Sequence, residues 1–175
     1  YGSGSSLIIS KNLVPYIKFD LGSIGYNNIS DANLTFYGTP DPYNPPPANQ
    51  EFAVFGLVDG SDSWQELTIN YNNAPVISNP VTWHPSLIYL GRIYYTAGDE
   101  NAITMEHTGG QPLNSFLNDR GPDSVVTIII ASGSYTDGYG YFSTKEDHGD
   151  ASEAPFLSFT VDPAVVQRNN WTGAD

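Results

Sequence analysis

Cysteine, basic side chains and long apolar runs are missing or scarce in this chain of 175 residues. There is no cysteine, so a disulfide framework is excluded and the redox compartment stays open. No run of eighteen apolar residues appears, which excludes a membrane-spanning helix. Six Lys and Arg stand against nineteen Asp and Glu, giving a net charge of -13, which disfavours binding to a nucleic-acid backbone.

The acidity fits an extracellular surface that is screened by divalent cations or simply solvated. The length suits one domain with a sizeable core. The chain begins at Tyr1 with neither an initiator Met nor a signal-peptide pattern, so we expect a processed form or a segment of a longer protein.

Short β-branched and aromatic runs recur between Gly and Pro turn signals, a pattern typical of an all-β protein. A single short helix is predicted over 112–120, where Leu113, Phe116 and Leu117 have helical spacing. We predict an antiparallel β-sandwich of jelly-roll type. Its strands are expected at 6–10, 15–21, 32–38, 51–58, 86–96, 102–108, 124–131, 140–144 and 155–161.

Two long loops are expected between these strands. The proline-rich segment 38–50 cannot form a ladder strand, and it is either a plain connection or a contact site for a ligand. Segment 143–155 is rich in carboxylates, and Asp147, Asp150 and Glu153 are candidate calcium ligands there. The alternative is a solvated loop, because the EF-hand spacing is absent.

Four segments in order resemble the disaggregatase-related (DNRLRE) domain, which in turn resembles carbohydrate-binding modules of the alginate-binding type. They are the opening "YGSGSSLIIS", "YIKFDLGSI" and "ISDANLTFYG"; the Trp-x-Glu signature with its following Thr, Asn and Pro residues in "SWQELTINYNNAP"; and the closing "GYFSTKEDHGDASEAPFLSFTV". The resemblance covers nearly the whole chain and implies a β-sandwich jelly roll without a catalytic centre.

The chain departs from that family at its beginning, where one further strand is normally found. The C-terminal segment "DPAVVQRNNWTGAD" has the character of this missing strand and its turn. We therefore predict a sandwich domain over 1–161 and an extension over 162–175 that completes a neighbouring copy, joined covalently in a tandem array or by strand donation. The residues of this assembly strand are Ala164, Val165, Val166, Gln167 and Arg168.

A sandwich that lacks a strand exposes unpaired backbone groups, which an inserted strand would satisfy. Such a head-to-tail contact propagates as a filament if its rotation does not close. Two alternatives stay open for the extension. It is a linker or loose tail, or it folds back and closes its own sandwich.

Nothing in the sequence predicts an enzyme. His84, His107 and His148 share no metal-ligand spacing, and the serine-containing segments "GSGSS" and "ASGSY" are not nucleophile elbows. No glycine-rich loop precedes a helix and a lysine. No cofactor is expected, apart from the candidate calcium.

A carbohydrate-binding module of a larger secreted protein, with an acidic polysaccharide such as alginate as ligand, is the alternative function. Aromatic rings would stack on sugar faces and cations would hold acidic groups. The candidates, expected to be exposed, are Lys18, Trp83, Arg92, Tyr94, Tyr95, Tyr139, Tyr141 and Lys145. Lys18 and Lys145 match positions where the family resemblance implies a basic residue. Trp64 matches its signature, although we expect Trp64 to pack inside the fold.

Sequons for N-glycosylation occur at Asn28, Asn33 and Asn170. Asn33 falls in a predicted strand, so a glycan would fit there only on a solvent face. The sequence thus predicts a non-catalytic, extracellular, glycosylated structural subunit that assembles with copies of itself. Its interactions are expected to include polysaccharide but neither nucleic acid nor membrane.

Overall fold

The computed structural model describes most of the chain. The described residues are 6–10, 12–21, 29–39, 49–58, 62–70, 72–76, 84–96, 101–107, 109–120, 125–132, 139–144 and 153–161, together with the backbone of 165–170. In this part of the chain, no helix has the length and apolar character needed to cross a membrane.

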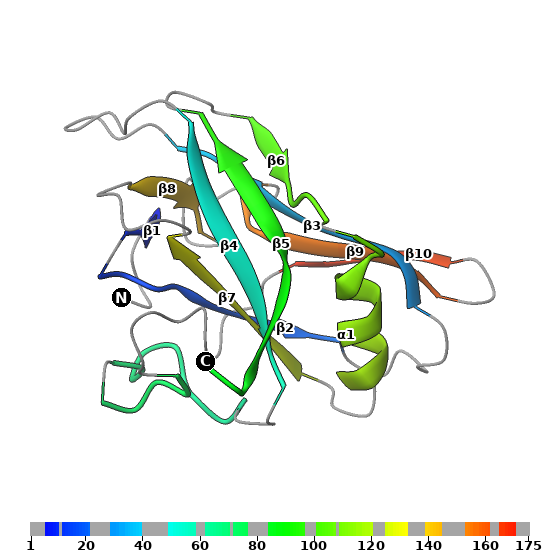
Figure 1. The fold of residues 1–175 in the computed structure, drawn as a ribbon, viewed down its shortest axis with the longest axis horizontal. Coiled ribbons are helices and arrows are strands. Elements are labelled where there is room, and N and C mark those ends of the chain that lie inside the picture. The colour runs from blue at the N-terminus through cyan, green and yellow to red at the C-terminus, as the bar shows by residue number, and fades with distance from the viewer. Residues whose placement is uncertain are drawn as a thin grey trace.

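The predicted all-β sandwich is confirmed (Figure 1). The strands are β1 (Ser6–Ile9), β2 (Tyr16–Asp20), β3 (Ile29–Tyr37), β4 (Gln50–Leu57), β5 (Leu87–Tyr95), β6 (Ala102–Thr104), β7 (Val125–Ser132), β8 (Gly140–Ser143), β9 (Phe156–Val161) and β10 (Val165–Asn170). The helix α1 spans Pro112–Arg120, which matches the predicted range.

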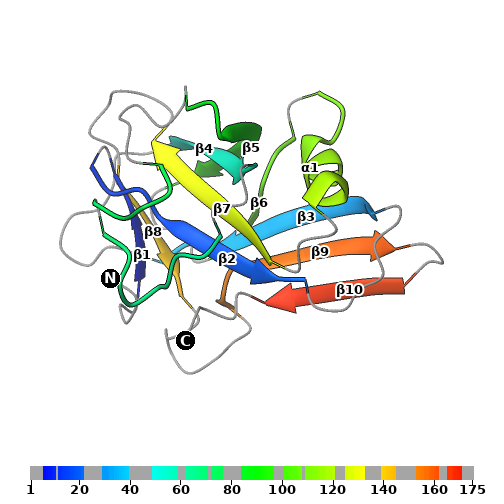
Figure 2. The same cartoon turned by 90° about the horizontal axis from the view of Figure 1, so that it is seen from below.

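Two four-stranded antiparallel sheets form the layers of the sandwich. One has the order β10-β9-β3-β6 and the other β2-β7-β4-β5, while β1 and β8 form a separate pair. Figure 2 shows the layers from the side, with α1 at one end and the β1–β8 pair at the other. The main core fills the space between the two sheets.

Strand β7 is the central apolar strand that the run "VVTIII" predicts. Val126, Ile128 and Ile130 point into the main core, whereas Ile129 and Ala131 belong to a second apolar cluster on the opposite face of the same sheet. A strand that is buried on both faces needs apolar residues at nearly every position.

Helix α1 closes one end of the sandwich by contacting β3 in one sheet and β5 in the other. Leu113, Phe116 and Leu117 are buried in the main core. The ring of Phe116 lies over Gly56 of β4, where a Cβ atom would come within 2.5 Å of the ring. The approach of the helix to this sheet therefore depends on a glycine at that position.

Two asparagines of α1 bind the backbone of β3 where its pairing with β9 is irregular, between Ser30 and Asn33. The side-chain oxygen of Asn114 accepts a hydrogen bond from the Ala32 amide at 2.9 Å. Asn118 bonds both the amide and the carbonyl of Ile29, at 2.8 and 2.9 Å. The helix thus satisfies backbone groups that the sheet leaves open there.

Candidate functional site

The last strand, β10, lies at the outer edge of its sheet. It pairs antiparallel with β9 of the same chain over six residues, from Val165 opposite Val161 to Asn170 opposite Phe156. Val165, Val166, Gln167 and Arg168 of the predicted assembly strand lie in β10, and Ala164 lies outside the described residues. In the single chain the extension folds back onto its own sandwich; pairing with a neighbouring copy stays a prediction.

The strand β10 also lies beside β2, the edge strand of the opposite sheet (Figure 2). At the other side of the sandwich, β5 is joined to the segment that follows β6 by backbone hydrogen bonds between Arg92 and Glu106, at 3.0 and 2.8 Å. One side of the sandwich is thus closed by neighbouring backbone. At the other side, β10 lies next to β9 of its own sheet and contacts β2 of the opposite sheet. We call this position between β9 and β2 the terminal slot.

The register between β9 and β10 defines which residues lie opposite one another in the terminal slot. Along β9, buried Leu157, Phe159 and Val161 alternate with half-exposed residues. The positions opposite these three are Asn169, Gln167 and Val165. Directly opposite residues in an antiparallel pair belong to the same face of the sheet. The six backbone pairs with β9 are therefore the contacts that define the position of β10.

A second candidate site lies on the outer face of β5, where Tyr89, Arg92 and Tyr94 follow one another. A bulge in β5 lies at Leu90 and Gly91: Gly91 pairs with Val54 and Tyr89 pairs with Phe55, so Leu90 is the extra residue. The extra residue changes the alternation, so that Leu90 and Ile93 both point into the core. Tyr89 and Tyr94 are 41% and 39% exposed. We call Tyr89, Arg92 and Tyr94, with Glu51 and Glu106 beside them, the aromatic strip.

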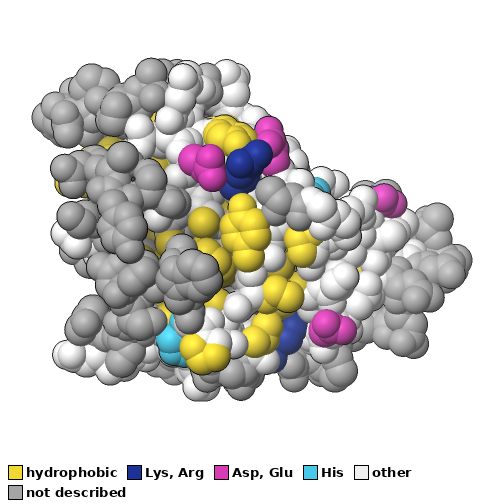
Figure 3. Space-filling view, viewed as in Figure 1, with side chains coloured by type: hydrophobic (Ala, Val, Ile, Leu, Met, Phe, Trp, Pro, Cys, Tyr) yellow, Lys and Arg dark blue, Asp and Glu magenta, His cyan; other side chains and the backbone are white. Residues whose placement is uncertain are grey.

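Charged groups surround the upper end of the aromatic strip (Figure 3). Nitrogens of the Arg92 guanidinium lie 3.8 Å from a Glu51 carboxylate oxygen and 3.9 Å from one of Glu106. The guanidinium also lies 4.8 Å from the centre of the Tyr94 ring. Both carboxylates stay about half exposed, with side-chain exposures of 48% and 59%. These groups can exchange hydrogen bonds with a polar ligand above the ring.

Tyr95, predicted to be exposed, is buried, so that prediction is wrong. Its side chain is fully buried, its ring packs edge-on against Phe142 at 5.4 Å, and its hydroxyl donates to the Thr39 carbonyl at 3.0 Å. Adjacent strand residues point to opposite faces, so exposure of Tyr94 requires burial of Tyr95. Tyr95 is therefore excluded as a stacking residue.

Residues 62–76 form an outer layer over the β2-β7-β4-β5 sheet, with Trp64 as its anchor. The indole is buried, as expected, and its N–H donates to the Thr127 hydroxyl at 3.0 Å. Thr127 in turn donates to Asp62, which forms an ion pair with Arg120. Glu66, the other residue of the Trp-x-Glu signature, is also buried in this layer. Both residues of the signature therefore belong to the interior of the fold.

The ammonium of Lys18 belongs to the same network. It donates to the Trp64 carbonyl and lies 4.3 Å from the centre of the indole ring. Desolvation by burial lowers the pKa of Lys18, and the carboxylates of Asp62 and Glu66 partly oppose that shift. Lys18 therefore serves an internal contact, which makes it a poor candidate for holding an acidic sugar.

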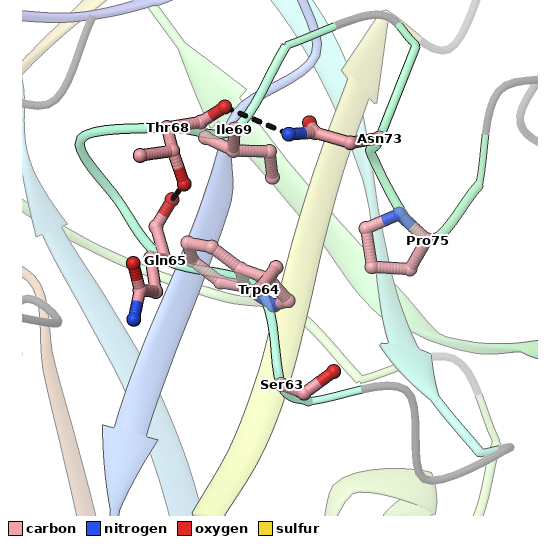
Figure 4. A pocket seen from close by; sticks show the side chains of 7 residues that line it. All are labelled: Ser63, Trp64, Gln65, Thr68, Ile69, Asn73 and Pro75. Carbon is pink, nitrogen blue, oxygen red and sulfur yellow. Dashed lines mark hydrogen bonds between the residues drawn. The ribbon is translucent and has the colours of Figure 1, made fainter.

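A hollow of about 510 Å³ opens on the surface of the outer layer (Figure 4). The Asn73 side chain already donates to the Thr68 carbonyl at 2.8 Å and accepts from the Asn70 amide at 2.6 Å. Its amide therefore maintains the turn and is not available for a ligand. The lining residues are Ser63, Trp64, Gln65, Thr68, Ile69, Asn73 and Pro75.

The other predicted sugar-binding residues are scattered. Tyr139 is 38% exposed and Tyr141 is half-buried in β8, away from the aromatic strip. Trp83 and Lys145 lie outside the described residues.

Only part of the glycosylation and calcium predictions falls on described residues. Asn33 is half-buried in β3 and donates to the Asp31 carbonyl at 2.8 Å. The backbone of Asn170 ends β10. Among the described residues, which include Glu153, no group of three His, Cys, Asp or Glu side chains is placed to hold a metal. Asn28, Asp147 and Asp150 lie outside them.

No protein-family model and no curated protein matches the chain. The resemblance to the disaggregatase-related domain stays a prediction. The functions of the terminal slot and the aromatic strip therefore follow from their own residues and contacts.

Proposed function

We propose that this protein is a non-catalytic extracellular structural subunit that assembles head to tail by exchange of its last strand. The observation that carries the proposal is the terminal slot, an edge position between β9 and β2 that the C-terminal strand occupies. In the assembly, β10 of one copy would occupy the same slot of the next copy, in the same register.

Exchange conserves the contacts of β10, so the contact energy is nearly unchanged, and the entropy of association and the protein concentration set the balance. The same six residue pairs form in either arrangement, and each ladder hydrogen bond contributes about 0.5–1.5 kcal/mol net. What changes is the connection between the two strands, which spans residues 162–164.

The sequence of that connection favours an extended path. Three-residue hairpin loops favour Gly or Asn at their last position, which takes a positive φ, but this chain has Ala164 there. Pro163 also disfavours helical geometry at Asp162. Because donor and acceptor surfaces differ, each exchange leaves a free donor and a free slot, and the assembly grows as a filament. A covalent tandem array would use the same pairing.

Cysteine cross-links test the proposal, because the natural chain has no cysteine. Val166 stands opposite Thr160 in the register. We expect Thr160→Cys/Val166→Cys, oxidised after assembly, to give a ladder of covalent multimers on denaturing gels. Oxidation of the dilute monomer should give an internal bond that blocks assembly. Thr160→Cys alone is the control.

A truncated chain that ends at Asp162 gives the complementary test. By size exclusion and negative-stain imaging, full-length protein should form filaments. The truncated form should stay monomeric or associate irregularly through its open slot, and it should bind a peptide of residues 162–175. Equally stable, monomeric full-length and truncated proteins would overturn the proposal, and so would filaments with internal cross-links only.

A carbohydrate-binding role is the second candidate, because the aromatic strip favours it. The two functions are compatible, since the exchanged strand β10 and the strand β5 of the strip belong to different sheets.

A further inference from the structure

We propose that the aromatic strip is a binding site for a neutral saccharide. The inference does not depend on assembly, because β5 and β10 belong to different sheets. It rests on the second candidate function and deepens it, because it keeps Arg92 and Tyr94 of the predicted sugar-binding residues and changes the ligand chemistry. Tyr89, Glu51 and Glu106 enter as binding residues, and the ligand is uncharged.

The two tyrosine rings of the strip are exposed but held in place. The Tyr89 ring packs edge-on against buried Phe55, with centroids 5.7 Å apart and an interplanar angle of 61°. The Tyr94 ring has the Arg92 guanidinium 4.8 Å from its centre. A ring that is already oriented loses little conformational freedom when a ligand stacks on it. The apolar C–H face of a pyranose suits such a platform.

The polar groups beside the rings match the hydroxyls of a sugar. The Arg92 contacts to Glu51 and Glu106, at 3.8 and 3.9 Å, are longer than hydrogen bonds. A hydroxyl can donate to either carboxylate and accept from the guanidinium, so one ligand group would satisfy both kinds of site.

The charge of the strip decides the class of sugar. Two carboxylates, Glu51 and Glu106, stand against the one guanidinium of Arg92, in a chain whose net charge is -13. A uronate or sulfate group would lie within a Debye length of both carboxylates, where repulsion is not screened. The strip therefore favours a neutral sugar and disfavours alginate, the ligand type that the family resemblance implies.

Peptide binding by strand addition fits this position poorly. The backbone of Arg92 already exchanges two hydrogen bonds with that of Glu106, so the edge of β5 is occupied where the strip lies. A peptide strand would have to displace this contact before it could pair.

Calorimetric titration of the full-length chain tests the assignment. The probes are β-1,4-glucohexaose, β-1,4-mannohexaose and α-1,4-glucohexaose, with hexamannuronate as the anionic comparison. We expect at least one neutral hexasaccharide to bind and hexamannuronate to bind at least tenfold more weakly. Tyr89→Ala and Tyr94→Ala should each weaken binding about tenfold or more, and Tyr94→Phe should retain it.

Tyr139→Ala is the matched control, since Tyr139, just before β8, has a similar exposure of 38%. It should bind like the natural chain. Circular dichroism and thermal unfolding establish that each variant is folded. Three results would overturn the assignment: no neutral probe binds, hexamannuronate binds more tightly than the neutral probes, or both alanine variants of the strip bind normally.

Loss of sugar binding and loss of assembly can be distinguished by separate variants. Variants of the strip should still form filaments. The cross-linked monomer Thr160→Cys/Val166→Cys should bind the saccharide as the natural chain does.

Discussion

The ammonium of Lys18 lies over the ring of Trp64, 4.3 Å from its centre, and donates a hydrogen bond to the carbonyl of the same residue. This pair joins the edge strand β2 to the outer layer of residues 62–76. The same strand borders the terminal slot. The outer layer therefore supports the strand against which β10 lies, and its integrity matters to both proposed functions.

Replacement of the anchor residue should weaken the whole outer layer. Trp64→Phe removes the hydrogen bond to Thr127 and leaves space beneath the ring, at an expected cost of about 2–4 kcal/mol in the free energy of unfolding. Urea denaturation measures the loss. Leu67→Ala is the control, because Leu67 is 70% exposed and should change stability by less than about 0.5 kcal/mol. Equal stability of the two variants would contradict the anchoring role.

The buried ion pair between Asp62 and Arg120 should show strong coupling. Their side chains are 12% and 9% exposed, so Asp62→Asn alone should cost about 3–5 kcal/mol by leaving a buried charge without its carboxylate. The double variant with Arg120→Met should cost less than the sum of the single changes. Glu51→Gln, at a more exposed ion pair, should cost less than about 1 kcal/mol. Additive single costs in a double-mutant cycle would refute the coupling.

Alkaline pH should destabilise the fold through Tyr16. Burial raises the pKa of its hydroxyl from 10.0 to about 12, and the hydroxyl donates a hydrogen bond to the Val76 carbonyl at 2.6 Å. Between these two pH values the unfolded chain loses the proton first, so the contribution of Tyr16 is complete below pH 10 and is lost as pH rises towards 12.

The variant Tyr16→Phe isolates this effect. At neutral pH it should be less stable by about 1–2 kcal/mol, because the Val76 carbonyl loses its partner. Denaturation at a series of pH values should show this difference shrinking above pH 10, since Phe does not ionise. Parallel stability profiles for the two proteins would show that Tyr16 does not titrate in this way.

The bulge at Gly91 should link stability to saccharide binding. A Cβ atom there would collide with the carbonyl oxygen of Glu106 and come within 3.2 Å of the Met105 side chain. Gly91→Ala should therefore open the contact between Arg92 and Glu106, cost about 1–3 kcal/mol in thermal unfolding, and weaken binding at the strip. Normal stability together with normal saccharide affinity would mean that the contact tolerates the added methyl group.

Local sequence patterns predicted which segments form strands. The run 125–131 is apolar except for Thr127 and lies in the central strand β7. Leu113, Phe116 and Leu117 predicted the helix, which spans the expected residues. These features follow from the alternation and spacing of apolar residues, which are properties of the local sequence. The burial of Trp64 was also predicted, but its partner Thr127 is 63 residues away and has no local signal.

The wrong prediction that Tyr95 is exposed shows what local sequence patterns do not determine. One of the two tyrosines had to point inward, and the bulge at Gly91 decides which, because one inserted residue reverses the alternation of the strand beyond it. The aromatic strip depends on the same bulge. It also needs Glu51 and Glu106, which come from separate segments and meet Arg92 only across the pairing of β5 with its neighbours.

By itself, the sequence determined that the chain is all-β, which segments form its strands, and that it carries a terminal segment with strand character. The strand bounds were less well predicted, since β3 begins at Ile29 instead of 32 and β6 ends at Thr104 instead of 108. Only the tertiary structure decided which strands pair, which face each tyrosine occupies, and that β10 fills an edge between β9 and β2. The physical reason is that strand formation depends on neighbours in the sequence, whereas pairing depends on backbone groups and apolar surfaces brought together from distant parts of the chain.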